Sequence, residues 1–363
     1  MEFEVHQVED VLTKNLINNT DMKRLFTLGL FLLSVTLMSA QQKVALQSNG
    51  ATTFFNSASA FVDAYNAAVD GDTIYLPGLQ YNSPATIQKR LAVFGTGYHP
   101  ENTEATGRTR IGAILIRDGG SGSHFEGMYV EGSIKLAGAL VQDITFKRMH
   151  VSGNIELFRA SNDACQDCRN ITVQECVAQA IVGIYAKADG VEISNSILKQ
   201  VSYFNNPDNG LVRVANNVIV DSYYNIYYLN NAMIENNVFA RTNSSTSYSS
   251  VAVSHGNMFR HNVFSDNPVG PEINTWSDNW VNIDPNTFFV AYTPTYAYEN
   301  NYQLAAPASY TGSTGNEVGL FGGYMPFKLN TRPSIPQIIQ QQVAGEVGAA
   351  GTLQVDIQVE AQQ

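Results

Sequence analysis

Oppositely charged side chains recur at fixed positions of a short phrase that the chain repeats. Glu192 and Arg213 occupy the second position of successive copies, and Glu235 and Arg260 occupy the fourth position of later copies. If the copies are adjacent strands, each pair lies side by side and can form a cross-strand ion pair. Such a pair contributes at most about 1 kcal/mol when it is exposed. Because paired opposite charges on strands are common, this structural interpretation is the favoured one.

Tyrosines form a second recurring set, near the outward position of a second short run in each repeat. Aromatic faces bury apolar area against a sugar ring at little entropic cost, while the phenol hydroxyl stays hydrated. The alternative is a stacking ladder that only stabilises the sheet, and the sequence does not decide between the two. The candidate substrate-binding residues are Tyr185, Tyr203, Tyr224 and Tyr227. The histidines His150, His255 and His261 are isolated in the sequence.

The repeated phrase itself predicts the elements that hold these side chains. Its third position is always large and apolar, at intervals of 20 to 27 residues: Phe125, Phe146, Val173, Ile193, Val214, Ile234 and Phe259. A period near twenty residues that tolerates insertions is typical of a solenoid, in which each repeat buries its apolar face against its neighbours. Apolar and polar residues alternate within the phrase, which indicates strands rather than helices. A leucine-rich repeat would need a near-constant length, and a propeller blade would need roughly twice the period.

The sixth position of the phrase predicts a ladder of side-chain hydrogen bonds between coils. It is occupied by Ser196, Asn217, Asn237 and Asn262. Asparagine satisfies backbone groups that strands leave free at a turn, and stacked asparagines can bond to one another. We therefore interpret these residues as structural, with the role of fixing the register between coils.

The two ends of the chain carry different signals. Residues 22–40 have the charged start, apolar stretch and small-residue end of a signal peptide, and residues 1–21 are an upstream extension. The apolar stretch is too short for a membrane span, so we expect none in the mature chain. Residues 57–72 predict an amphipathic helix that caps the open end of the stack, followed by a first strand at 73–78. Residues 326–363 predict a proline-containing linker and a small β-hairpin or cap, because apolar and polar residues alternate over 352–360.

Together, the capping helix, the run Gly71-Asp-Thr-Ile-Tyr-Leu-Pro-Gly78 and the x-Ile-x-Asn-Asn-x-Phe phrases resemble the pectin-lyase-like superfamily. The resemblance covers roughly residues 50–325 and implies an all-β, right-handed parallel β-helix of the secreted bacterial type. Residues 300–305 and the glycine-rich run 319–327 resemble the closing coils of such proteins. The superfamily includes lyases, hydrolases, esterases and non-catalytic binding or adhesive proteins, so the fold alone does not assign an activity.

Polysaccharide lyases of this superfamily pair an acidic or calcium-bound clamp with a Lys or Arg base. The resemblance therefore implies the candidate catalytic residues Lys147, Glu192, Arg213, Glu235 and Arg260. Glu175 could join Glu192 and Glu235 in a calcium site, or such carboxylates could act as a pair in a hydrolase. Dense Asp clusters like those of the catalytic members are absent from the sequence.

The net charge and the cysteine content of the chain limit the kinds of partner and compartment that we expect. The formal net charge of −11 disfavours nucleic acid and would repel an acidic glycan that calcium does not bridge. Cys165 and Cys168 are the expected disulfide pair in an oxidising compartment, with Cys176 as a buried apolar residue. The leading hypothesis is an exported β-helix that engages a polysaccharide along its lateral face. The alternatives are a lyase or glycoside hydrolase acting on an acidic glycan, and a purely structural or adhesive surface protein.

Overall fold

The computed structural model of the chain describes residues 43–101, 107–157, 167–183, 187–204, 211–220, 223–241, 245, 247–268, 273–293, 295–343 and 351–360. The chain divides into the units Met1–Gln42 and Lys43–Gln363, and the description below concerns the second. The upstream extension and the signal peptide expected at 1–40 lie outside the described residues. Within the described ranges, no helix has the length and apolar character needed to cross a membrane.

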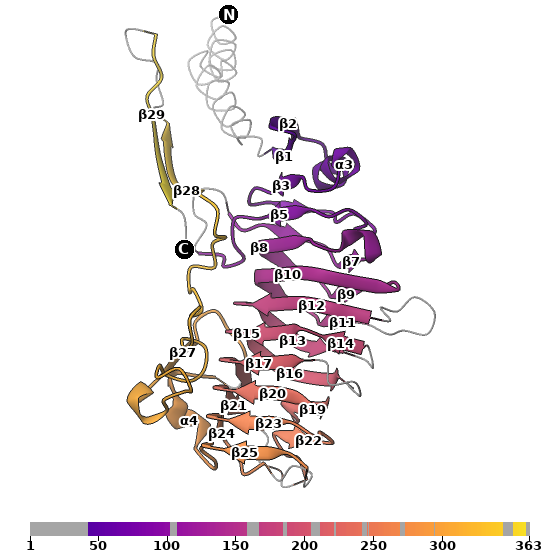
Figure 1. Cartoon of the computed structure of the whole chain (residues 1–363). Helices are drawn as coiled ribbons and strands as arrows, with labels where there is room; N and C mark the ends of the chain where they lie inside the picture. Colours follow the sequence, from indigo (N-terminus) through magenta and orange to yellow (C-terminus); the bar gives the residue numbers. More distant parts are fainter. Residues whose placement is uncertain are drawn as a thin grey trace, which may run out of the picture. The chain divides into compact units, whose positions relative to one another are not determined.

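The second unit is a parallel β-helix of about eight turns, in which each coil contributes short strands to three columns (Figure 1). The first column contains β3 (Thr73–Tyr75), β5 (Ala92–Phe94), β8 (His124–Val130), β10 (Leu140–Val151), β12 (Asp167–Gln174), β15 (Val191–Ser194), β17 (Val212–Ala215), β20 (Ala232–Glu235), β23 (Met258–Arg260) and β25 (Thr275–Ser277). In addition, β14 (Lys187–Asp189) pairs with the start of β12. The predicted all-β solenoid is confirmed.

The second and third columns complete each coil. The second contains β4 (Gln80–Tyr81), β6 (Arg110–Ile111), the ends of β8 and β10, β13 (Val177–Val182), β16 (Ile197–Phe204), β18 (Val218–Val220), β21 (Val238–Ala240) and β24 (Val263–Phe264). The third contains β7 (Ile114–Ile116), β9 (Ile134–Leu136), β11 (Ile155–Leu157), the ends of β13 and β16, β19 (Ile226–Leu229) and β22 (Val251–Ala252). All these pairings are parallel.

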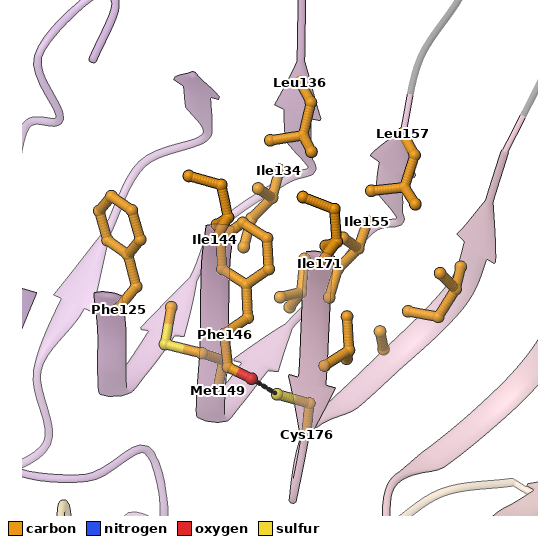
Figure 2. Close-up of a cluster of buried hydrophobic side chains, with 14 of the residues drawn as sticks. Phe125, Ile134, Leu136, Ile144, Phe146, Met149, Ile155, Leu157, Ile171 and Cys176 are labelled. Carbon is orange, nitrogen blue, oxygen red and sulfur yellow. Dashed lines mark hydrogen bonds between the residues drawn. The ribbon is translucent and has the colours of Figure 1, made fainter. Parts of the chain in front are cut away.

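The apolar third position of the phrase forms the core of the first column. Val214 pairs with Ile234 in direct register, and Phe146 pairs with Phe125 on one side and Val173 on the other. All seven predicted residues are 0% exposed. Figure 2 shows Phe125 and Phe146 pointing from β8 and β10 into the same interior as the β9 and β11 side chains. Each such buried side chain contributes roughly 1.5–3 kcal/mol, so the repeated apolar position holds the coils together.

The predicted asparagine ladder is present and extends one coil further than expected. The Oδ1 atom of Asn237 accepts hydrogen bonds from both the backbone N–H (2.9 Å) and the side-chain amide (3.0 Å) of Asn217. Asn262 receives the same two bonds from Asn237, and Asn279 receives them from Asn262. Each amide nitrogen also donates to backbone carbonyls, as Asn237 does to Val214 and Glu235. Every rung therefore satisfies buried backbone groups of two coils at once.

The N-terminal cap combines the predicted helix with a hairpin that we did not predict. The helix α3 (Ala60–Ala67) buries Phe61 and Ala64 against the core, as expected from its amphipathic pattern. Ahead of it, β1 (Val44–Ser48) and β2 (Ala51–Phe55) form an antiparallel pair, and β1 pairs antiparallel with β3. The predicted first strand at 73–78 is thus the third strand in the chain. The hairpin covers the edge that β3 would otherwise leave open.

The structure describes two of the three cysteines, Cys168 and Cys176, and both agree with the states expected from the sequence. Cys168 is disulfide-bonded, and Cys165 lies outside the described residues. Cys176 is a free, fully buried thiol, as predicted, and its Sγ donates to the carbonyl of Phe146 at 3.4 Å (Figure 2). Burial raises the pKa of this thiol to about 12, so it stays protonated and apolar.

Beyond the last coil, the chain turns back along the solenoid. After α4 (Pro285–Phe288), β26 (Phe289–Ala291) pairs antiparallel with β27 (Asn301–Leu304), and a 3-10 turn, η2, follows at Pro307–Ser309. Residues 310–334, here called the return segment, then contact progressively earlier coils: Ser313 bonds Asn236, Gly322 bonds Asn195, and Ser334 bonds Glu126. The closing coils expected at 300–305 and 319–327 are therefore not coils but an antiparallel strand and part of this segment.

The chain continues into a hairpin. β28 (Gln337–Val343) pairs antiparallel with β29 (Val355–Glu360), and all residues of β29 are exposed. Arg332 of the return segment forms an ion pair with Glu360 at 2.6 Å.

The ladder makes a stability prediction. We expect Asn237→Ala to lower the free energy of unfolding by about 2–4 kcal/mol, because it leaves several buried backbone and amide groups without partners, each worth roughly 1–3 kcal/mol. Denaturant unfolding measures the change. Asn66→Ala on the exposed side of α3 is the control and should stay within about 0.5 kcal/mol of the wild type. Equal effects of the two substitutions would contradict a structural ladder.

Candidate functional site

The predicted charged pairs form one continuous chain of ion pairs along the first column. Arg213 donates to Glu192 at 2.7 Å and to Glu235 at 2.8 Å, and Arg260 donates to the second oxygen of Glu235 at 2.6 Å. Glu192 lies in register with Arg213, and Glu235 with Arg260, as the repeated positions predicted. We call these four residues the ion-pair chain.

Glu235 is the centre of the ion-pair chain and is more enclosed than its outward position suggested. It is 3% exposed because the two guanidinium groups cover it, whereas side chains of Arg213 and Arg260 remain 32% and 37% exposed. Burial alone would raise the pKa of Glu235, but hydrogen bonds and charges from Arg213 and Arg260 outweigh burial and lower it. A carboxylate held ionised in this way is a partner for arginine rather than a proton donor.

The geometry favours the structural interpretation of the candidate catalytic residues. A general base must be free to reach the proton that it removes, whereas Arg213 is engaged by two carboxylates. Lys147 lies in register with Glu126 and Gln174, away from Glu235 along the column. The calcium ligands also do not converge, because Glu175 binds Arg148 instead. Among the described residues, no three His, Cys, Asp or Glu side chains are placed to hold a metal ion.

The tyrosines gather on the third column. Tyr203 on β16 stacks on Tyr228 of β19 with ring centroids 5.7 Å apart, and Tyr224 stacks on Tyr227 at 5.0 Å. Tyr248, from the next coil, contacts Tyr224 at 5.4 Å and Tyr223 at 4.7 Å. The tyrosine patch is defined here as Tyr203, Tyr223, Tyr224, Tyr227, Tyr228 and Tyr248. Of the four predicted binding residues it contains three, and Tyr185 lies outside the described residues.

The register within the patch places Tyr228, and not the candidate Tyr227, beside Tyr203. Tyr227 pairs with Ser202, so the residue that follows Tyr203 up the column is Tyr228 rather than Tyr227. Tyr203 and Tyr228 both have left-handed backbones, with φ of 62° and 50°, and so does Val253 on the next coil, with φ of 50°. Bulky residues disfavour this left-handed backbone conformation, which costs of order 1–3 kcal/mol for each residue. It persists only where contacts with the surrounding structure impose it.

A cleft adjoins the patch. It measures about 580 Å³ and is lined by Tyr224, Tyr248, Arg241, Asp266 and Asn267, with the serines and small residues between them. Arg241 donates to Asp266 at 3.2 Å, and Asp266 also accepts from the backbone and hydroxyl of Ser250. The two charges balance, so the cleft combines aromatic side chains with an ion pair that has no net charge.

A buried ionic cluster under the return segment was missed. Arg148, 1% exposed, donates to Glu175 at 3.0 Å and lies 3.5 Å from Glu126, which also contacts His124 at 2.9 Å. Arg148 and Glu175 occupy the fifth position of the phrase, where every copy has a left-handed backbone. Burial would raise the pKa of Glu126, but hydrogen bonds from His124 and Ser334 and nearby positive charge lower it overall. The asparagines at this position in later copies were a usable signal that the fifth residue turns the chain.

The same cluster anchors the return segment. Glu175 accepts from the backbone N–H of Lys328 at 3.1 Å, Arg148 donates to the carbonyl of Arg332 at 2.9 Å, and Glu126 accepts from both the backbone and hydroxyl of Ser334. The cluster is therefore a fastening for residues far away in the sequence rather than a catalytic centre.

His150, which looked isolated in the sequence, is enclosed by aromatic rings. Its ring lies edge-on to Tyr98, Tyr129, Tyr296 and Tyr298, with centroids 4.9–5.6 Å away, and its Nδ1 is 2.7 Å from the Tyr298 hydroxyl. Burial, assisted by the charge of Arg108, lowers the pKa of His150 to about 4, so the ring is neutral at neutral pH. His261 occupies the fifth position of its phrase and has a left-handed backbone, with φ of 52°, so it is a turn residue.

Comparisons with known proteins add no identification to this geometry. No protein-family model, no curated protein and no solved structure matches the chain. The parallel β-helix stands on the structure, while the likeness to the pectin-lyase-like superfamily and the secreted bacterial type remain predictions from the sequence.

The ion-pair chain predicts a stability effect that depends on pH. We expect Glu235→Gln to cost about 1.5–3 kcal/mol at neutral pH, because it removes charge-assisted hydrogen bonds from two arginines. The pKa of Glu235 is lowered by folding, so its contribution is complete above the ordinary value of 4.5 and is lost as the pH falls through the lowered value. Urea unfolding from pH 7 to 3 should therefore show the wild type and the variant converging in acid. A constant difference would contradict this account.

The buried cluster predicts a larger effect. Arg148→Met should destabilise the protein by about 3–5 kcal/mol, because it leaves two carboxylates buried without their cation. It should also loosen the return segment, so limited proteolysis should cleave between residues 328 and 336 faster than in the wild type. Arg169→Met, which removes only an exposed ion pair with Asp167, is the control. Unchanged proteolysis in Arg148→Met would contradict the fastening role.

Proposed function

We propose that this chain is an exported β-helix protein that binds a polysaccharide along its lateral face, with the tyrosine patch and the adjoining cleft as the contact surface. The observation that supports this most directly is the strained backbone at Tyr203 and Tyr228. Asparagine or glycine would suit these left-handed positions better, and the fold instead uses them to hold two parallel tyrosine rings at the surface.

The composition of the surface suits a neutral glycan. Tyr223 is 56% exposed, and Tyr228 and Tyr248 are 36% exposed, so aromatic area is open to a ligand. The cleft beside them carries one arginine and one aspartate in mutual contact, and the whole chain is acidic. A polymer of uronates would find no uncompensated positive charge there, whereas a neutral sugar ring can stack on tyrosine and bond to the polar groups of the cleft.

Glycan-array screening followed by titration calorimetry with the best polysaccharide tests the proposal. The double variant Tyr224→Ala/Tyr227→Ala should bind at least about tenfold more weakly, because each aromatic contact contributes roughly 0.5–1.5 kcal/mol beyond burial. Tyr324→Ala is the matched control, since Tyr324 is 88% exposed and lies outside the patch. If the wild type bound no glycan, the structural or adhesive alternative would replace this proposal.

A stability measurement on the same proteins separates binding from a stacking ladder. Tyr223→Ala removes the most exposed ring of the patch, so its free energy of unfolding should stay within about 0.5 kcal/mol of the wild type while glycan affinity falls. A loss of stability without any change in affinity would assign the tyrosines to the sheet alone.

The enzymatic alternative is tested with the same glycans. Incubation with calcium, followed by unsaturated-product absorbance and reducing-end assays, would reveal a lyase or hydrolase. Because Arg213 and Arg260 are held by carboxylates, we expect binding without turnover. Turnover that Arg213→Ala abolished would favour the enzyme instead.

A further inference from the structure

A second cavity lies between the solenoid and the segments that return along it. It measures about 290 Å³, near the lower end of the range for small-molecule sites. The solenoid contributes Tyr98, His99 and Ile197, and residues 296–302 and 320–331 form the opposite wall. None of its lining residues belongs to the tyrosine patch or to the cleft beside it. We call it the aromatic cavity.

Two tyrosine hydroxyls at this cavity have no protein partner in the described part of the chain. Tyr98 is 1% exposed and Tyr296 is half-buried, and none of the hydrogen bonds formed by the described residues reaches either hydroxyl. Neighbouring polar groups are already occupied: Tyr298 bonds His150, and Tyr302 accepts from Asn300. Neither hydroxyl is among the buried side-chain atoms that lack a partner, so both remain accessible, and a hydroxyl that no described residue engages can donate to and accept from a bound molecule.

The walls of the cavity carry no charge. Its lining includes no Lys, Arg, Asp or Glu, and burial lowers the pKa of His99, the one titratable base among the lining residues. The ring faces of Tyr98, Phe321 and Phe327 supply apolar surface. A carboxylate entering this cavity would lose its hydration without gaining a cation, which disfavours charged ligands.

The cavity is also held open by contacts on both sides. Asn195 donates to the carbonyls of Leu320 and Gly322 at 3.0 and 2.9 Å, and the Thr331 hydroxyl accepts from the backbone N–H of His99 at 3.1 Å. These bonds tie the return segment to the solenoid immediately around the cavity. A site formed in advance in this way does not need to be ordered by its ligand.

We propose that the aromatic cavity binds a single uncharged sugar residue, with the Tyr98 and Tyr296 hydroxyls as hydrogen-bonding partners and the surrounding rings as stacking surfaces. The site is separate from the tyrosine patch and goes beyond the proposed function, since it takes one ring rather than a polymer. Its ligand is a free monosaccharide or the end of a chain, and the two share the same chemistry.

Saturation-transfer NMR and calorimetry with D-glucose, D-galactose, D-mannose and D-xylose, alongside D-glucuronate and D-galacturonate, test this. At least one neutral sugar should bind with a millimolar Kd, and the uronates should bind at least tenfold more weakly. Tyr98→Phe and Tyr296→Phe should each weaken the neutral sugar about threefold to tenfold, as expected for the loss of one hydrogen bond. Both variants should fold normally, because each removes a hydroxyl that no described residue uses.

The controls distinguish this site from the patch. Tyr223→Ala should leave monosaccharide affinity unchanged, while Tyr98→Phe should leave polysaccharide binding by the patch unchanged. A disaccharide or a longer oligomer with the preferred end group distinguishes a chain end from a free sugar. The proposal is overturned if no neutral sugar binds at concentrations on the order of 100 mM, or if affinity is the same without the two hydroxyls. In either case the cavity holds only water. Polysaccharide binding by the tyrosine patch would be decided separately, by the glycan titrations with the patch variants.

Discussion

In the later coils, from Ser196 to Asn279, the hydrogen bond from each coil to the ladder amide of the next is the interaction on which the other features depend. A coil that slipped by one residue would turn its buried apolar side chain outward, and the ladder would lose its acceptor at the same step. Asn217, Asn237, Asn262 and Asn279 each bind backbone as well as side chain, so they hold the register from inside the stack. Because the register is fixed, outward-facing side chains at the same position of successive coils line up in a row on the surface of the solenoid.

These rows of aligned side chains have different roles on the different faces of the solenoid. On the first column, the glutamates and arginines of the ion-pair chain neutralise one another, so that part of the surface has little net charge. At the left-handed turns, the early coils carry Arg148 and Glu175, and the return segment covers them. On the third column, the tyrosines remain uncovered although their backbone conformation is unfavourable. Exposed apolar area combined with strain points to an interaction, whereas covered charge points to assembly of the fold.

Periodic features could be predicted from the sequence, and non-periodic ones could not. The core file, the ladder and the pairing of Glu192 with Arg213 all recur at fixed positions, so one alignment of the phrases located them. The register of Tyr203 with Tyr228 was not predicted because these coils differ in length and each of the two strands contains a left-handed residue. The burial of Glu235 follows from long arginine side chains folding over it, which a strand pattern does not describe. His150 and Tyr98 meet Tyr298 only because the chain doubles back, and contacts between such distant residues leave no local pattern.

The return segment changes how this solenoid holds together. In a simple stack each repeat touches only its neighbours, so the ends can fray coil by coil while the middle stays folded. Here residues 310–334 connect the coil of Asn236 to that of Glu126, with hydrogen bonds to Asn236, Asn195, Glu175, Arg148 and Glu126. Opening one coil then disturbs a strand shared by several others, which joins separate foldons into a single cooperative unit. Because the return segment bonds to several coils, the terminal coil cannot unfold without breaking contacts that also hold earlier coils, so the solenoid resists unfolding from its end.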